Sequence, residues 1–205
     1  MPKGEIAAVV LAAGASRRFG EYNKLLAEIG GQTLIACVLK VLADAGVAQV
    51  IVVTGWDGEG VSRAVRGHDV RLVHNAGWDA GMGSSIGVGI AALDAAASGA
   101  IIIPSDMPRL TSGFIAALME TFEGAGGERV VYPTTLAGEQ RNPVLWPRRF
   151  FGALQGLNPA EGAKSLLLQL PASDRIALAI EDAGVFLDVD TQAELDKARG
   201  GQAGS

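Results

Sequence analysis

The residues best placed to do chemistry in this sequence are carboxylates that follow or alternate with apolar residues. Asp106 comes just after the apolar run 100–104, and Asp188 and Asp190 alternate with apolar residues near the end of the chain. Hard divalent cations take oxygen ligands, and Mg²⁺ is usually held by one or two carboxylates together with phosphate oxygens. These acids therefore predict a magnesium site, with Asp106 as its first ligand.

The spacing of the second carboxylate pair suggests which of its members binds the metal. If 185–189 is a strand, Asp188 and Asp190 fall on one face of it, because side chains alternate with period two. Asp190 lies nearest the end of that strand, so we favour it as the second ligand. Two alternatives stay open: Asp106 as a turn residue before a proline, and Asp190 as the start of the next helix, where Thr191 and Glu194 form a capping box.

A basic, glycine-containing loop follows the first apolar run. Residues 11–20 read LAAGASRRFG, and Lys24 follows four positions after the last glycine. Small residues let backbone amides face a ligand, and Arg17, Arg18 and Lys24 supply the positive charge that phosphate requires. The spacing fits neither a Walker A loop nor the dinucleotide-binding GxGxxG pattern. The alternative is a solvated basic turn between a strand and a helix.

The surrounding segments predict a parallel sheet covered by helices, because apolar runs of strand length alternate with stretches of helical period. We expect strands at 6–11, 49–54, 70–74, 100–104, 130–133, 143–146, 175–179 and 185–189. Helices are expected at 34–44, 59–66, 84–97, 112–122, 148–155, 163–169 and 192–199. Loops that follow parallel strands meet at one edge of the sheet, where such folds bind ligands.

Glycines in the expected helix 84–97 also resemble a known pattern. Gly83, Gly87 and Gly89 mimic the glycine-rich motif of short-chain dehydrogenases, but neither Tyr22 nor Tyr132 has the lysine four positions on that such enzymes need. We expect Gly87 and Gly89 instead to let the helix pack closely on the sheet.

Composition limits the class of protein further. The chain has 205 residues, 49% of them hydrophobic, and 17 Lys+Arg against 22 Asp+Glu give a formal charge of −5. We expect a single domain over 1–199 and a disordered tail over 200–205. The negative charge argues against nucleic acid or an anionic membrane as partner. Cys37 has no disulfide partner and no apolar run is long enough to span a bilayer, so we expect a cytoplasmic protein.

Several motifs together resemble those of the MobA-like nucleotidyltransferases. The first loop with Lys24 resembles that family's nucleotide loop, IIIPSDMP around Asp106 its metal motif, and HNAGWDAGMGSS at 74–85 its nucleoside loop. The segments 140–146 and 159–164 resemble the pair that shapes the acceptor pocket. The resemblance implies a three-layer αβα, Rossmann-like (GT-A-like) fold with a mostly parallel central sheet.

The resemblance also implies roles for individual residues. The catalytic set is Arg17, Lys24 and Asp106, and the metal would be held by Asp106 with Asp190 or Asp188. The implied nucleotide-binding residues are Leu11, Ala12, Ala13, Gly14, Ser16, Arg17, Lys24, Thr54, Asn75, Gly81, Met82, Ser84, Ser85 and Asp106. The implied acceptor-binding residues are Arg141, Asn142 and Pro143.

The resemblance implies Mg²⁺-dependent transfer of CMP from CTP to the phosphate of molybdopterin, with release of pyrophosphate. Guanylyltransferases of this group typically carry Ala-Gly-Gly where this chain has Ala12-Ala13-Gly14, which favours CTP. A GTP-using relative, a cytidylyltransferase for another sugar or alcohol phosphate, and a non-catalytic carrier of the molybdenum cofactor are the alternatives. The implied partners are the small-molecule substrates and, transiently, a molybdenum hydroxylase.

Overall fold

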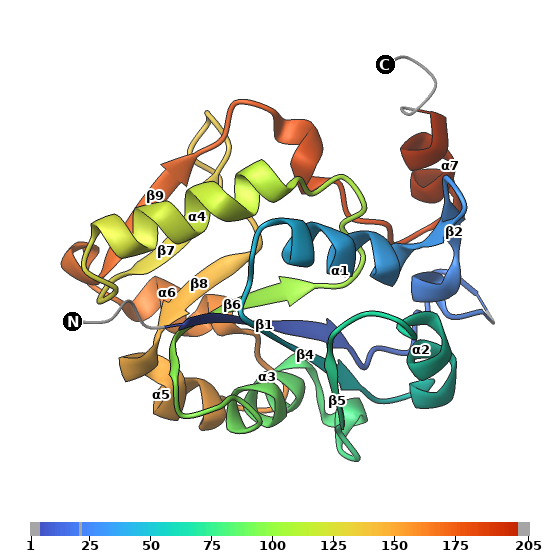
Figure 1. The fold of residues 1–205 in the computed structure, drawn as a ribbon, viewed down its shortest axis with the longest axis horizontal. Helices are drawn as coiled ribbons and strands as arrows, with labels where there is room; N and C mark the ends of the chain where they lie inside the picture. The colour runs from blue at the N-terminus through green and yellow to red at the C-terminus, as the bar shows by residue number, and fades with distance from the viewer. Residues whose placement is uncertain (1–4, 21, 201–205) are drawn as a thin grey trace.

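The computed structural model describes residues 5–20 and 22–200, and its central feature is a mostly parallel sheet (Figure 1). Within the described residues the sheet has seven strands, in the order β5-β4-β1-β6-β8-β7-β9. The strands are β1 (Glu5–Ala12), β4 (Gln49–Thr54), β5 (Arg71–His74), β6 (Ala97–Pro104), β7 (Val130–Thr134), β8 (Val144–Pro147) and β9 (Arg175–Ala179). Only β8 pairs antiparallel with its neighbours, β6 and β7.

Helices cover both faces of this sheet, which confirms the three-layer architecture. The α-helices are α1 (Leu34–Asp44), α2 (Gly58–Ala64), α3 (Met82–Ala91), α4 (Ser112–Gly124), α5 (Phe151–Gln155), α6 (Ala163–Gln169) and α7 (Gln192–Gly200). The 3-10 helices are η1 (Lys24–Leu26), η2 (Trp78–Ala80), η3 (Arg148–Phe150), η4 (Ala172–Asp174) and η5 (Ala183–Phe186). Figure 1 shows α1 and α4 on one face and α3 and α5 on the other.

Two hydrophobic cores follow from the alternation of side chains along the strands. In β1, Ala8 and Val10 join the core beneath α1 and α4. Ala7 and Val9 join the core against α3, α5 and α6. No helix in the described part of the chain is long and apolar enough to cross a membrane.

Seven of the expected strands are confirmed with small shifts at their ends, but the expected strand at 185–189 is wrong. The segment begins as η5 and continues without regular structure to Asp190. The segment meets the loop that follows β6, where the Val189 amide donates to the Asp106 carbonyl, and both edges of β6 are already paired, one with β1 and the other with β8. An extended segment arriving there therefore has no free strand edge to join.

Two further differences concern local signals. The helix expected at 84–97 ends at Ala91, because Ala97 pairs with Glu5 at the start of β6. A hairpin of β2 (Glu28–Ile29) and β3 (Gln32–Thr33) was not expected. Its two-residue turn, Gly30-Gly31, has positive φ at both positions, the conformation that such turns require. Of the expected tail, Gly200 ends α7, and 201–205 lie outside the described residues.

The glycines of α3 pack against two different neighbours. A Cβ on Gly89 would overlap Val9 Cγ1 and stand 2.9 Å from Val53 Cγ2, so this glycine allows close approach to the sheet. A Cβ on Gly87 would instead meet the Gln155 carbonyl of α5 at 3.3 Å. The expected close packing on the sheet is therefore confirmed for Gly89, whereas Gly87 faces α5.

Gly89→Ala is expected to lower the free energy of unfolding by about 1–3 kcal/mol, because the added methyl overpacks the interface between α3 and the sheet. The matched control is Gly113→Ala in α4, where no atom lies within 4 Å of the added Cβ. This control should stabilise by up to about 1 kcal/mol, since alanine favours the helix. Urea unfolding of both variants measures the difference. Equal free energies of unfolding for Gly89→Ala and Gly113→Ala would show that the tight contact at Gly89 is absent.

Candidate active site

The loops that follow β1 and β6 form the centre of the site. Leu11 of β1 pairs with Pro104 of β6, so the two strands end together. Both point towards the side of the molecule where β2 and α7 lie (Figure 1). The buried Ser105 hydroxyl donates to the Leu11 carbonyl at 2.6 Å and joins the two strand ends. Asp106 is thereby held beside the basic first loop.

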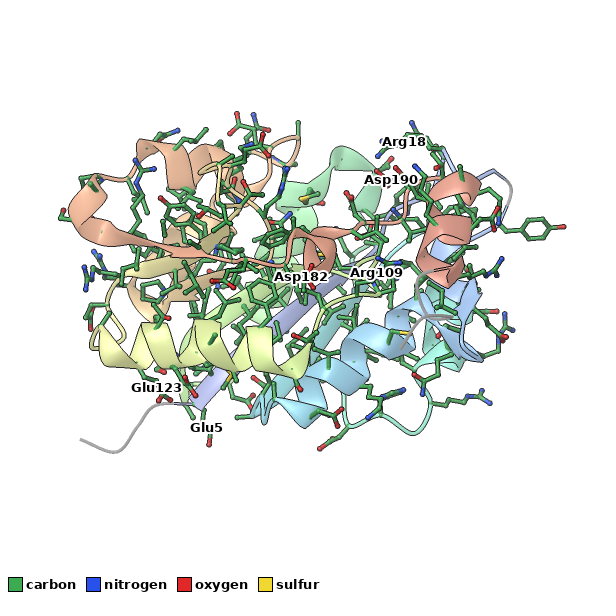
Figure 2. All side chains as sticks on the ribbon, turned by 90° about the horizontal axis from the view of Figure 1, so that it is seen from above. Glu5, Arg18, Arg109, Glu123, Asp182 and Asp190 are labelled. Atoms are coloured by element: carbon green, nitrogen blue, oxygen red, sulfur yellow. The ribbon has the colours of Figure 1, made fainter. Side chains whose placement is uncertain are left out.

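A lysine links the two carboxylates that the sequence singled out. Lys24 Nζ donates to Asp106 Oδ2 at 2.5 Å and to Asp190 Oδ1 at 2.7 Å. Arg18 Nη2 lies 2.7 Å from Asp190 Oδ2, and Figure 2 shows these two side chains together near α7. The Val189 amide donates to the Asp106 carbonyl at 2.9 Å and so brings the second acidic segment to the first.

The two acids of that segment lie in different surroundings. Because 185–189 is not a strand, the expectation that Asp188 and Asp190 share a strand face is wrong; Asp188 is exposed while Asp190 meets Lys24. The amides of Asp190 and Thr191 both donate to Glu194 Oε2, at 2.9 and 2.8 Å. The Glu194 amide donates back to Thr191 Oγ1 at 3.3 Å, which confirms the expected capping box. This cap fixes the backbone at Asp190.

Burial and charge act on the pKa values of this cluster in opposite directions. Burial raises the pKa of the Asp106 carboxyl, and the Lys24 ammonium opposes that rise only in part. Burial alone would lower the pKa of Lys24, but the charges and hydrogen bonds of Asp106 and Asp190 together raise it. Lys24 is therefore a cation at neutral pH.

One oxygen of the cluster has no partner among the residues that the structure describes. Asp106 Oδ1 is buried and accepts no hydrogen bond from any described residue. A buried oxygen of this kind is costly to leave unsatisfied. With Asp190 it forms a donor set made only of carboxylate oxygen, which is the set that a hard divalent cation prefers. The residues present thus fit a magnesium ion.

A cavity of about 420 Å³ opens beside this cluster, between the first loop and the segment around η2. Most of the expected nucleotide-binding residues line it. They are Leu11, Ala13, Gly14, Ser16, Arg17, Lys24, Gly81, Met82, Ser85 and Asp106. We call it the smaller cavity.

A larger cavity of about 890 Å³ adjoins the smaller one. Arg141 and Asn142 line it, as expected for acceptor binding, but Pro143 does not. Its wall includes the side chain of Trp146, whose Nε1 is buried with no hydrogen-bond partner among the described residues. The two cavities share a wall. Its residues are Leu11, Arg18, Lys24, Met82, Pro104, Asp106 and Asp190.

Residues 8–175 match the MobA-like NTP transferase domain. The chain belongs to this family. Among curated relatives, it is 36% identical over 125 residues to the bifunctional protein GlmU of Heliobacterium modesticaldum, covering 58% of this chain and 26% of that protein. It is 32% identical over 121 residues to a probable molybdenum cofactor guanylyltransferase of Haloferax mediterranei, covering 59% and 57%. The chain thus spans less than two thirds of either relative.

Solved structures agree with this assignment. The crystal structure of Rv0371c from Mycobacterium tuberculosis superposes with a TM-score of 0.81 at 25% identity, covering 96% of this chain and 98% of that one. The resemblance read from the motifs is therefore confirmed at the level of family and fold.

Four expected nucleotide-binding residues of this MobA-like domain lie behind the cavity walls. Ala12 is buried in the core, and Thr54 Oγ1 contacts the Val73 carbonyl at 3.5 Å. Asn75 Nδ2 donates to Ser84 Oγ at 2.9 Å and to Ser85 Oγ at 3.0 Å. Of Asn75, Ser84 and Ser85, only Ser85 lines the smaller cavity. Asn75 and Ser84 shape the loop that carries Ser85, Gly81 and Met82.

Asn23, which the sequence analysis missed, organises the basic loop of the MobA-like domain. Its Oδ1 accepts from the Leu25 amide at 3.1 Å and from Ser16 Oγ at 3.5 Å, and its Nδ2 donates to Asp57 Oδ2 at 3.1 Å. Ser16, which has φ +51°, accepts from the Lys24 amide at 3.3 Å. Asparagine is a favoured N-cap residue, so its place just before η1 was a usable signal.

Proposed function

We propose that this chain transfers CMP from CTP to the phosphate of molybdopterin and releases pyrophosphate in a Mg²⁺-dependent reaction. The observation that carries the proposal is the convergence of Asp106, Asp190 and Lys24 on the wall shared by the two cavities. Membership of the MobA-like NTP transferase domain family supplies the reaction class. We assign the nucleotide to the smaller cavity and the acceptor to the larger.

In this reaction an oxygen of the acceptor phosphate forms a bond to the α-phosphorus of the nucleotide. The bond from the α-phosphorus to the oxygen that bridges to the β-phosphorus breaks, and its electron pair leaves with pyrophosphate. The protein therefore needs no covalent nucleophile. Two adjacent cavities hold donor and acceptor on either side of Asp106, and such positioning is itself a large part of catalysis.

Asp106 and Asp190 are the residues that would hold the magnesium ion. When bound, the ion neutralises charge on the phosphates of the nucleotide and acts as a Lewis acid. Among the residues that the structure describes, no three or more His, Cys, Asp or Glu gather into a metal cluster. The set is therefore the kind that Mg²⁺ uses with water and substrate phosphate, rather than an all-protein cage.

The first loop supplies the remaining positive charge. Arg17 is exposed on the wall of the smaller cavity, and Lys24 lines both cavities. Cations at these places stabilise the negative charge that develops on the leaving pyrophosphate. In the larger cavity, Arg141 pairs with Glu139 at 2.5 Å, and Lys164 is exposed. Either cation could meet an anionic acceptor.

The choice of CTP rests on Ala13. Ala13 lines the smaller cavity and is buried at the β4 end, where a Cβ on Gly55 would stand 2.8 Å from Ala13 Cβ. In the proposed assignment this methyl narrows the nucleotide pocket and favours the single ring of cytosine over the two rings of guanine. GTP is the second candidate donor, because the Haloferax mediterranei relative is a probable molybdenum cofactor guanylyltransferase.

Ala13→Gly is expected to raise kcat/KM for GTP relative to CTP by about tenfold, since one methyl in a pocket is worth about 10–200-fold in discrimination. The ratio is measured from initial rates of pyrophosphate release. Ala15→Gly is the matched control, because it removes a methyl from the same loop and the same cavity. If the two variants shift the ratio equally, loop flexibility rather than the Ala13 methyl sets the donor.

The proposed reaction is tested by measuring pyrophosphate release with CTP and with GTP, each offered with molybdopterin and with methylerythritol phosphate. We expect release only with CTP and molybdopterin. Turnover only with GTP would contradict the cytidylyl assignment, and turnover with methylerythritol phosphate would contradict the acceptor. A protein that binds molybdopterin and never releases pyrophosphate would be a carrier. Contact with a molybdenum hydroxylase and the cytoplasmic location stay predictions.

A further inference from the structure

The ammonium group of Lys24 lies where a cation bound to both carboxylates would lie. Lys24 Nζ is 2.5 Å from Asp106 Oδ2 and 2.7 Å from Asp190 Oδ1, and the Lys24 side chain is only 14% exposed. These are the two carboxylates that the proposed function assigns to Mg²⁺. In this state Lys24 already offsets part of their negative charge.

We propose that Lys24 is a placeholder for the metal ion, and that its exchange between the carboxylates and the nucleotide phosphates couples the binding of metal and nucleotide. The proposal rests on the proposed function for the identity of the metal ligands. Two cations a few ångströms apart repel strongly inside a protein, so a metal ion held by Asp106 and Asp190 displaces the ammonium. The displaced ammonium then needs another anion.

The structure provides a place for the displaced group. Lys24 is the first residue of η1 and lines both cavities, and its long stem lets Nζ turn from one wall to the other. The smaller cavity also contains Arg17 and the small residues of the first loop, where we assign the nucleotide phosphates. A triphosphate there would draw Lys24 away from the carboxylates and leave them free for metal. By linkage, metal bound first would strengthen nucleotide binding by the same factor.

Arg18 provides a matched comparison within the same cluster. It also contacts Asp190, at 2.7 Å, but its side chain is 74% exposed against 14% for Lys24. Solvent screens an exposed pair, so its contribution is small. Removing the Arg18 charge should therefore affect metal binding much less than removing the Lys24 charge.

The proposal predicts opposite effects of one substitution on two ligands. Without nucleotide, Lys24→Gln should bind Mn²⁺, an oxygen-preferring substitute for Mg²⁺, at least about tenfold more tightly than the wild type. In EDTA, the same variant should bind CTP at least about tenfold more weakly. Arg18→Gln should change Mn²⁺ affinity by less than about threefold. The free Mn²⁺ signal in electron paramagnetic resonance and calorimetric titration of CTP measure these affinities.

Three further variants localise the effect. Lys24→Arg keeps the charge and should bind Mn²⁺ as the wild type does. Asp106→Asn should lose Mn²⁺ binding. The double variant, Lys24→Gln with Asp106→Asn, should not show the tighter Mn²⁺ binding of Lys24→Gln. Thermal melting confirms that each variant is folded.

Unchanged or weaker Mn²⁺ binding by Lys24→Gln would overturn the placeholder, while loss of Mn²⁺ by Asp106→Asn would leave the proposed function standing. Tighter Mn²⁺ binding with unchanged CTP binding would overturn the coupling. Full Mn²⁺ affinity in Asp106→Asn would instead show that the metal site of the proposed function is misplaced, and the placeholder would fall with it.

Discussion

Asp106→Asn is expected to lower kcat by about a thousandfold or more, which corresponds to about 4 kcal/mol of transition-state stabilisation. The change keeps the shape of the side chain but removes the charge that, with Asp190, would hold Mg²⁺. Asp106 Oδ1, the buried oxygen with no partner among the described residues, becomes part of an uncharged amide. Steady-state pyrophosphate release measures the loss.

The control for this experiment is nucleotide binding without metal. Calorimetry in EDTA should show CTP binding to Asp106→Asn at least as tight as that of the wild type, because the first loop and the segment around η2 are unchanged and Lys24 loses one of its two carboxylate partners. Asp69→Asn, at an exposed position outside both cavities, should keep full turnover. Turnover by Asp106→Asn within tenfold of the wild type would contradict the assignment of Asp106 as a metal ligand.

Asp190→Asn is expected to lower kcat by about a hundredfold, in the range found when a preorganised charge is removed from an active site. Its neighbour Asp188 provides the matched comparison. Asp190 accepts from Lys24 at 2.7 Å and lines both cavities, whereas Asp188 is exposed and lines only the larger one. Asp188→Asn should therefore change kcat by less than about threefold, because solvent screens an exposed charge.

The kcat values of Asp188→Asn and Asp190→Asn are compared together with the melting temperatures of the two variants. Equal losses for Asp188→Asn and Asp190→Asn would show that the choice between them is wrong. A larger loss for Asp188→Asn would place it in the metal site in spite of its exposure. Melting temperatures close to that of the wild type are needed for both comparisons, since the Asp190 backbone is part of the helix cap at Glu194.

The sequence predicted the position of Asp106 at the end of a strand, because that signal is local. A buried β-branched run, 101–103, ends three residues before it, and a strand of a parallel sheet delivers its last side chains to the ligand-binding edge. Lys24 was found in the same way, from its place after the small residues of the first loop. Their meeting at 2.5 Å follows once β1 and β6 are neighbours, and the period of the sequence does not reveal which strands pair.

The expected strand at 185–189 was wrong for a non-local reason. Apolar and acidic residues do alternate over 187–190, and Val189 is fully buried in a small core with Leu34 and Leu195. This burial produces the period of a strand without strand pairing. Both edges of β6, the strand that ends just before Ser105 and Asp106, are occupied by β1 and β8, and β8 comes from a distant part of the chain.

Supporting residues were the hardest to find. Ser105 was not among the expected site residues, and only the structure shows that its hydroxyl donates to the Leu11 carbonyl. Asn75 was expected to meet the nucleotide, yet it holds the hydroxyls of Ser84 and Ser85. Motifs identify residues near a ligand, but they do not separate those that touch it from those that hold the touching residues in place.

The most direct test of the proposed reaction follows the α-phosphate itself. The wild-type protein is incubated with CTP labelled at the α-phosphate, molybdopterin and Mg²⁺, and the pterin product is isolated and analysed by mass spectrometry. The proposal predicts label in a cytidylylated molybdopterin, formed in equal amount to the pyrophosphate released and lost in Asp106→Asn. Label that stays in CTP or appears in free CMP, with unmodified molybdopterin, would contradict it.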